Sequence, residues 1–300
     1  MLGPILFLLY INDFPKSSSF FNFTLFADDS TLSFKCNQTD STTTQNLIET
    51  ELSKVKLWLL CNKLSLNINK CQQINFSYSG TRTNHPLSFG SGQITQVTQT
   101  KFLGVTVDNN LRFKPHILRI SKLLSRSLGI LHSLKFILPT NILLNIYFSI
   151  FHCHLSYAVE SWYAAPAYIT NKIFFQQKKA VRAIFKLPFN SHTSQSFKHA
   201  RILKLPDLFK FQICSLIHSC HISPSSSNIS SMIQGHMDIH SYQTKNSSNL
   251  VLPRFRRSRS QTSFLYQAVR EYNALPANIK TNNSIFTFKK SLKSYYLNNY

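Results

Sequence analysis

Acidic residues are scarce in this 300-residue chain, which has 11 aspartates and glutamates against 33 lysines and arginines and therefore a net charge of +22. An excess of this size favours a polyanion as the partner and predicts binding that weakens steeply as salt is added. The alternative is a basic surface without a specific partner. Because the cations are spread along the chain, the charge suggests a nucleic-acid partner without locating its site.

A disulfide framework and long apolar runs are also missing. The six cysteines show no pairing pattern, which fits a reducing compartment. The apolar stretch at residues 2–11 is far shorter than the roughly 20 residues that a membrane-spanning helix needs, and it lacks the basic start of a signal peptide. We therefore expect no membrane segment. An apolar fraction of 43% and 25 phenylalanines instead indicate a folded chain long enough for two or three domains.

The most informative stretch is residues 21–34, where apolar side chains alternate on both sides of an acidic pair. This alternation predicts two strands, and the pair Asp28-Asp29 followed by Ser30 predicts a tight turn between them. Two carboxylates at the tip of such a hairpin repel each other, and a hard divalent cation would relieve the repulsion. The alternative is an ordinary solvated turn.

Four segments around this hairpin stand in a characteristic order. They are LGPILFLLYINDFP at residues 2–15, FADD at 26–29, WL with NKLSLNINK within 58–70, and KFLGV at 101–105. In this order they resemble the reverse transcriptase of non-LTR (LINE-like) retrotransposons. FADD is similar to that family's metal-binding box, the first segment to the end of the preceding box, and the last segment to the primer-grip motif. The resemblance continues weakly to the C-terminus.

The resemblance implies an RNA-directed DNA polymerase, which extends a DNA primer on an RNA template with deoxynucleotides. It implies two Mg²⁺ ions in the complete enzyme, with Asp28 and Asp29 as metal-binding catalytic residues. Lys70 is expected to donate a proton to the departing pyrophosphate, as a cation near the leaving phosphate would. A solvated loop lysine is the alternative. The family also implies an intracellular protein of the cytoplasm and nucleus.

Residues expected to contact nucleic acid fall in three places. They are Phe102, Leu103 and Gly104 in the primer-grip segment, Lys178, Lys179 and Arg182 on a predicted helix over residues 169–187, and Arg254, Arg256 and Arg257 in a basic run. Arginines around an aromatic residue suit phosphate contact combined with base stacking. A solvated helix face and a flexible basic loop are the alternatives for the second and third places.

The predicted fold class is α+β. By the resemblance, a truncated polymerase palm covers residues 1–107, and its antiparallel sheet has the Asp28-Asp29 hairpin near the middle. An all-helical thumb or connection is expected over 108–222, a polar linker over 223–253, and a basic helical tail over 254–300. Residues 100–107 are expected as one strand, in which a glycine allows close backbone approach.

The sequence is expected to be a fragment of such a polymerase. In the family, another metal-binding carboxylate and a Pro-Gln-Gly loop of the nucleotide pocket precede the first segment, and neither is found in this sequence. The 300 residues alone are therefore expected to be inactive as a polymerase. Two alternatives stay open: a module that binds RNA or hybrid duplex without catalysis, and the product of a decayed element that has no function.

Overall fold

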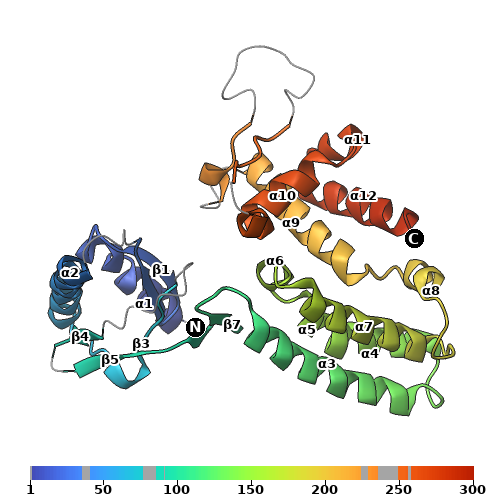
Figure 1. Cartoon of the computed structure of the whole chain (residues 1–300), viewed down its shortest axis with the longest axis horizontal. Coiled ribbons are helices and arrows are strands. Elements are labelled where there is room, and N and C mark those ends of the chain that lie inside the picture. The colour runs from blue at the N-terminus through green and yellow to red at the C-terminus, as the bar shows by residue number, and fades with distance from the viewer. Residues whose placement is uncertain are drawn as a thin grey trace. The chain divides into compact units, whose positions relative to one another are not determined.

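The computed structural model describes residues 2–35, 41–76, 86–90, 92–223, 229–235, 249–255 and 258–300, without the side chains of residues 41, 42, 258 and 259. The chain divides into two compact units, Met1–Lys101 and Phe102–Tyr300 (Figure 1). Helices and small sheets make up the first unit, and helices dominate the second, so the α+β class is confirmed. Among the described residues, no helix combines the length and the apolar character that crossing a membrane requires.

The first unit begins with the apolar helix α1 (Leu2–Ile11), which the short helix η1 (Phe14–Ser17) follows. A hairpin comes next, formed by β1 (Asn22–Phe26) and β2 (Asp29–Ser33). Its inner face packs aromatic rings together. The ring of Phe14 lies 5.1 Å from that of Phe23 and 4.9 Å from that of Trp58.

Helix α2 (Ser41–Cys61) supplies the other side of this core. Its buried stripe is Ile48, Leu52, Val55 and Leu59, at the spacing of one helix face. Leu47 lies off this stripe and is 46% exposed. After α2 comes the short helix η2 (Ile68–Lys70).

The remaining strands of the first unit form a small mixed sheet. Its strands are β3 (Gln72–Gln73), β4 (Leu87–Phe89) and β5 (Gly92–Gln96), with β3 parallel and β4 antiparallel to β5. The prediction of one antiparallel sheet with the acidic hairpin near its middle is therefore wrong for the described residues. The physical reason is that the hairpin and β4 do not pair with each other. Each instead packs apolar side chains against the buried face of α2.

The expectation of a single strand over residues 100–107 is also wrong. The chain turns at Leu103 and Gly104, which have positive φ values of 43° and 82°. Strands β6 (Gln99–Phe102) and β7 (Val105–Asp108) therefore pair with each other as a two-stranded ribbon. Glycine allows this because it enters the left-handed region without a steric penalty.

The second unit is a set of packed helices. They are α3 (Lys114–Leu134), α4 (Thr140–Ile146), the π-helix η3 (Tyr147–His152), α5 (Cys153–Ser156), α6 (Val159–Trp162), α7 (Ala167–Ile184), α8 (Ser194–His199), α9 (Leu205–Ile222), the short helices η5 (Ser230–Met232) and η7 (Ser258–Thr262), α10 (Phe264–Asn273), α11 (Ala277–Lys280) and α12 (Ile285–Asn298). Helix α3 packs on α7, and α9 packs on both α10 and α12.

One apolar core joins the α-helices and η3 of this unit. It contains Leu124 of α3, Trp162 of α6, Ile173 of α7, Ile213 of α9 and Phe288 of α12, each fully buried. The helices of residues 264–298 therefore share the core of the preceding helices. Much of the predicted polar linker, residues 224–228 and 236–248, lies outside the described residues.

Candidate functional site

The acidic pair lies at the tip of the β1–β2 hairpin. Phe26 pairs with Asp29 across the strands, so Ala27 and Asp28 form a two-residue loop. The turn thus lies one residue earlier than the sequence suggested. Ala27 has a φ of 51°, a left-handed conformation that costs about 1 kcal/mol for a residue other than glycine. The hairpin holds this strained residue directly before Asp28.

The two faces of the hairpin differ in chemistry. Phe23 faces Leu32 on the inner side, whereas Phe26 faces Asp29 on the outer side, since directly opposed residues share a face. Phe26 is 62% exposed, and both Asp28 and Asp29 are exposed as well. The tip therefore presents two solvated carboxylates beside a bare aromatic ring.

The donor set at the tip fits a particular kind of cation site. Mg²⁺ in proteins is commonly held by one or two carboxylates and takes its other oxygens from water and substrate phosphates. Asp28 and Asp29 match that requirement. Across the described parts of the chain, no group of three or more His, Cys, Asp or Glu side chains is placed to hold a metal. The pair thus has the type of donor that Mg²⁺ takes in proteins, and by itself it is not a complete protein cage.

Lys70 ends the short helix η2, which packs on β5. Its backbone N–H donates to the carbonyl oxygen of Asn67 at 3.0 Å, and its side chain is exposed. Within the described residues, no hydrogen bond or ion pair joins Lys70 to Asp28 or Asp29. The structure therefore leaves the proposed proton donor and the acidic pair on separate elements.

The Leu103–Gly104 turn is held by side chains from two helical segments. Tyr157, directly after α5, donates its hydroxyl to the Leu103 carbonyl oxygen at 2.5 Å. Arg119 of α3 donates to the Gly104 carbonyl oxygen. A Cβ added to Gly104 would lie 3.2 Å from the Tyr157 ring. The turn is therefore fixed from both sides, although Phe102 beside it remains 36% exposed.

A buried histidine ties β7 to α3 in the same region. The Thr106 N–H donates to Nδ1 of His116 at 3.1 Å, and His116 is completely buried. Burial, with a smaller contribution from the Arg119 charge, lowers the pKa of His116 to about 4. The imidazole is therefore neutral near pH 7, and because Nδ1 accepts a hydrogen bond, its proton lies on Nε2. Sequence reasoning missed His116, Arg119 and Tyr157.

The three cations expected on α7 have different surroundings. The Lys178 ammonium lies 4.4 Å above the Phe174 ring. Arg182 donates Nε to the Ser191 carbonyl oxygen at 3.0 Å. Lys179 is exposed. The pKa of His132 is lowered first by burial and then by the charges of Lys135 and Lys179, so Lys179 lies near both residues. Of the three, Lys179 thus belongs to a wider basic patch, which also includes Lys135 of the α3–α4 connection.

The third expected contact region is only partly described. Arg254 is exposed, and the adjacent Phe255 ring lies 6.1 Å from that of Tyr266. Arg256 and Arg257 lie outside the described residues.

Lysines and arginines occur along the whole chain, but most of the net positive charge lies in the second unit. Residues 102–300 hold 25 of the 33 lysines and arginines but five of the 11 acidic residues, a net charge of +20. Among the described residues, four ion pairs are formed, and two of them share Glu271. Most of this charge is thus available to a polyanion.

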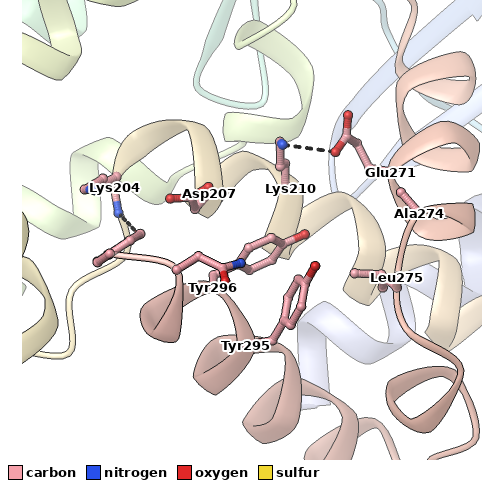
Figure 2. A pocket seen from close by; sticks show the side chains of 10 residues that line it. Lys204, Asp207, Lys210, Glu271, Ala274, Leu275, Tyr295 and Tyr296 are labelled. Atoms are coloured by element: carbon pink, nitrogen blue, oxygen red, sulfur yellow. Dashed lines mark hydrogen bonds and ion pairs between the residues drawn. The ribbon is translucent and has the colours of Figure 1, made fainter.

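A polar cleft of about 280 Å³ lies among α9, α10 and α12 (Figure 2). Its charges are matched internally. Lys210 pairs with Glu271 at 3.2 Å, and the Lys204 ammonium lies 3.9 Å above the Tyr300 ring. Burial raises the pKa of Asp207, and a hydrogen bond from Tyr300 opposes that shift. These contacts join α9 to α10 and to Tyr300 directly beyond α12, which is a structural role.

A curated protein similar to this chain is "RNA-directed DNA polymerase from mobile element jockey" of Drosophila melanogaster. The two are 24% identical over 238 residues, with 75% of this chain and 25% of that protein covered. The chain is thus similar to a reverse transcriptase. It spans about a quarter of the length of this relative. The family suggested by the sequence motifs agrees with the relative's name. No protein-family model and no solved structure matches the chain.

Proposed function

We propose that this chain is part of the RNA-directed DNA polymerase of a non-LTR retrotransposon, in which the first unit carries the metal-binding hairpin and the second unit holds template and primer. The observation that carries the proposal is the exposed Asp28-Asp29 pair at the tip of a β-hairpin. The similarity to the jockey polymerase and the net charge of +20 on residues 102–300 support it.

In this proposal each expected residue has a role at the primer end. Asp28 and Asp29 hold Mg²⁺, which when bound polarises the primer hydroxyl and neutralises the triphosphate of the incoming deoxynucleotide. Lys70 delivers a proton to the leaving pyrophosphate. The turn at Phe102, Leu103 and Gly104 lies against the primer.

The basic residues of the second unit hold the duplex backbone. Lys179 contributes from its patch with Lys135, and Arg254 to Arg257 contribute from the segment before η7. Lys178 and Arg182 also belong to this surface, each oriented by its contact with Phe174 or Ser191. Because such contacts release counterions, binding should weaken as salt rises.

We infer that these 300 residues do not polymerise by themselves. Two metal ions need more oxygen ligands than one acidic pair supplies, and the described residues bring no third acidic side chain to the hairpin tip. A second candidate function follows from the charge: the chain binds RNA–DNA hybrid as a module without catalysis.

Primer extension and hybrid binding, measured together, test the proposal. We expect purified protein to bind an RNA–DNA hybrid with a strong salt dependence and to add no nucleotide to a DNA primer on poly(rA) with Mg²⁺ and dTTP. Nucleotide addition that disappears in Asp28→Asn would contradict the inferred inactivity and support the polymerase role. Hybrid binding that does not change with salt would contradict the whole proposal.

A further inference from the structure

The second unit contains a larger cleft that no step of the proposed reaction uses. Its volume is about 550 Å³. Its lining comes from the segment before α3, the α6–α7 connection, α9, the end of η7 and α10. They are Leu111, Arg112, Tyr163, Ala164, Ala165, Pro166, Ala167, Phe209, Thr262 and Gln267.

One wall of the cleft is an aromatic pair. The rings of Tyr163 and Phe209 are stacked, with centroids 4.6 Å apart and an interplanar angle of 28°. Burial, together with the nearby Asp207, raises the pKa of Tyr163, so its phenol stays protonated and can donate a hydrogen bond. The small side chains of residues 164–167 leave room beside these rings for another flat group.

Arg112 supplies the charge at this cleft. Its side chain is exposed, and no acidic partner is found for its guanidinium among the described residues. Nor does any lining residue carry a carboxylate. Gln267 is already engaged, since its Nε2 donates to the Gln261 carbonyl oxygen at 2.7 Å and its Oε1 accepts from Arg270 at 2.6 Å. The lining residues thus carry one positive charge and no negative charge, which favours an anionic ligand over a cationic one. Two carboxylates lie nearby but outside the lining: Asp108, which accepts the Arg112 backbone N–H at 3.2 Å, and Asp207.

We propose that this cleft binds one unpaired nucleotide of a nucleic-acid strand, with its base against Tyr163 and its phosphate on Arg112. Stacking on an aromatic ring beside a cation is how proteins bind single strands without reading their sequence. The matched charges of the polar cleft in Figure 2 provide a contrast, because Lys210 there is neutralised by Glu271. The inference rests on the proposed function for the identity of its partner.

Fluorescence anisotropy with a labelled single-stranded oligodeoxynucleotide, and with an otherwise identical abasic strand, tests the inference. We expect wild-type protein to bind the base-containing strand about 10-fold more tightly, a typical effect of losing a base–aromatic stack. Tyr163→Leu should abolish this difference, and Ala167→Trp should do the same by filling the cleft. Tyr168→Leu is the matched control, because Tyr168 is 64% exposed on α7, directly after the lining residue Ala167, and does not itself line the cleft.

The charge is tested by Arg112→Gln, with Arg126→Gln as its control. Arg126 is exposed on α3 outside the cleft, so both variants lose one charge. We expect only Arg112→Gln to weaken binding of the base-containing strand several-fold. Photocrosslinking with a 5-iodouracil oligonucleotide should place the adduct on the peptide that contains Tyr163. Thermal melting of each variant shows whether it is folded.

The possible outcomes separate this inference from the proposed function. Equal affinity of wild type for base-containing and abasic strands, or adducts only on other peptides, would overturn the inference even if hybrid duplex is bound. Loss of hybrid binding alone, with the base effect intact, would overturn the polymerase proposal and leave the nucleotide site standing. Wild-type protein that binds neither probe would refute both.

Discussion

The hydroxyl of Tyr157 donates a hydrogen bond of 2.5 Å to the carbonyl oxygen of Leu103, a residue 54 positions earlier in the chain. Arg119 binds the next carbonyl oxygen, that of Gly104. Two helical segments of the second unit thus fix the turn that we propose lies against the primer. The Trp162 indole N–H in turn donates to the Tyr157 carbonyl oxygen at 3.0 Å, which holds Tyr157 itself in place.

Replacing Tyr157 with phenylalanine should loosen this turn without unfolding the unit. The variant loses one solvent-accessible hydrogen bond, which contributes about 1 kcal/mol. We expect hybrid binding to weaken about 3-fold to 10-fold and the amides of residues 104–106 to exchange faster with solvent. Anisotropy and hydrogen exchange measure both effects. Tyr168→Phe is the control, and an unchanged exchange rate in Tyr157→Phe would refute the role of this hydrogen bond.

Gly104→Ala should destabilise the second unit. Gly104 has a φ of 82°, and an added Cβ would meet the Tyr157 ring at 3.2 Å. We expect a loss of about 1–2 kcal/mol in the free energy of unfolding, seen as a lower Tm. Gly129→Ala is a matched control because Gly129 lies within α3, where an added Cβ meets nothing within 4 Å. Helix propensity predicts that this second change raises stability by about 0.5–1 kcal/mol.

His116 should make stability depend on pH. Its pKa falls from 6.5 to about 4 on folding, so the unfolded chain binds the proton more tightly. The stabilising contribution is therefore complete above pH 6.5 and is lost progressively as the pH falls toward 4, on the order of 3 kcal/mol.

Denaturant unfolding of His116→Asn measures this contribution. Asparagine can still accept the hydrogen bond from Thr106 but cannot titrate, so the variant should lose less stability than wild type between pH 6.5 and pH 4. His192→Asn is the control, since His192 lies on an exposed loop. If the free energy of unfolding of His116→Asn falls with pH as steeply as that of wild type, His116 is not the group responsible.

Lys179 should contribute one phosphate contact. The logarithm of the binding constant falls linearly with the logarithm of the salt concentration. Neutralising one phosphate contact lowers the magnitude of this slope by about one and weakens binding to all sequences alike. We expect Lys179→Gln to show both effects in hybrid-binding titrations. Lys16→Gln is the control, because Lys16 is already paired with Asp13 at 2.8 Å in the first unit. An unchanged slope in Lys179→Gln would exclude this lysine from the interface.

Local sequence patterns predicted the local structure well. The β1–β2 hairpin and helix α7 were both predicted from local patterns, which depend on neighbours within a few residues. The strand boundary at Gly104 was missed because a glycine in an apolar run fits either a strand or a turn, and contacts with Tyr157 and Arg119 accompany the turn that forms.

The candidate site was predictable only where its residues are close in sequence. Asp28 and Asp29 are adjacent, so their shared location could be deduced. Other contacts join residues tens of positions apart, as Tyr157 with Leu103 and Tyr163 with Phe209 do. Sequence periodicity does not predict such pairs. The concentration of charge in residues 102–300 became clear only when the boundary after Lys101 was known.

The central claim is that the hairpin tip binds a divalent cation together with substrate. Paramagnetic Mn²⁺, added to ¹⁵N-labelled protein with RNA–DNA hybrid and dTTP, tests it by NMR. The account predicts selective broadening of the amides of residues 26–30, which Asp28→Asn abolishes and Asp13→Asn does not. Uniform broadening, or broadening at residues 26–30 that survives in Asp28→Asn, would contradict it.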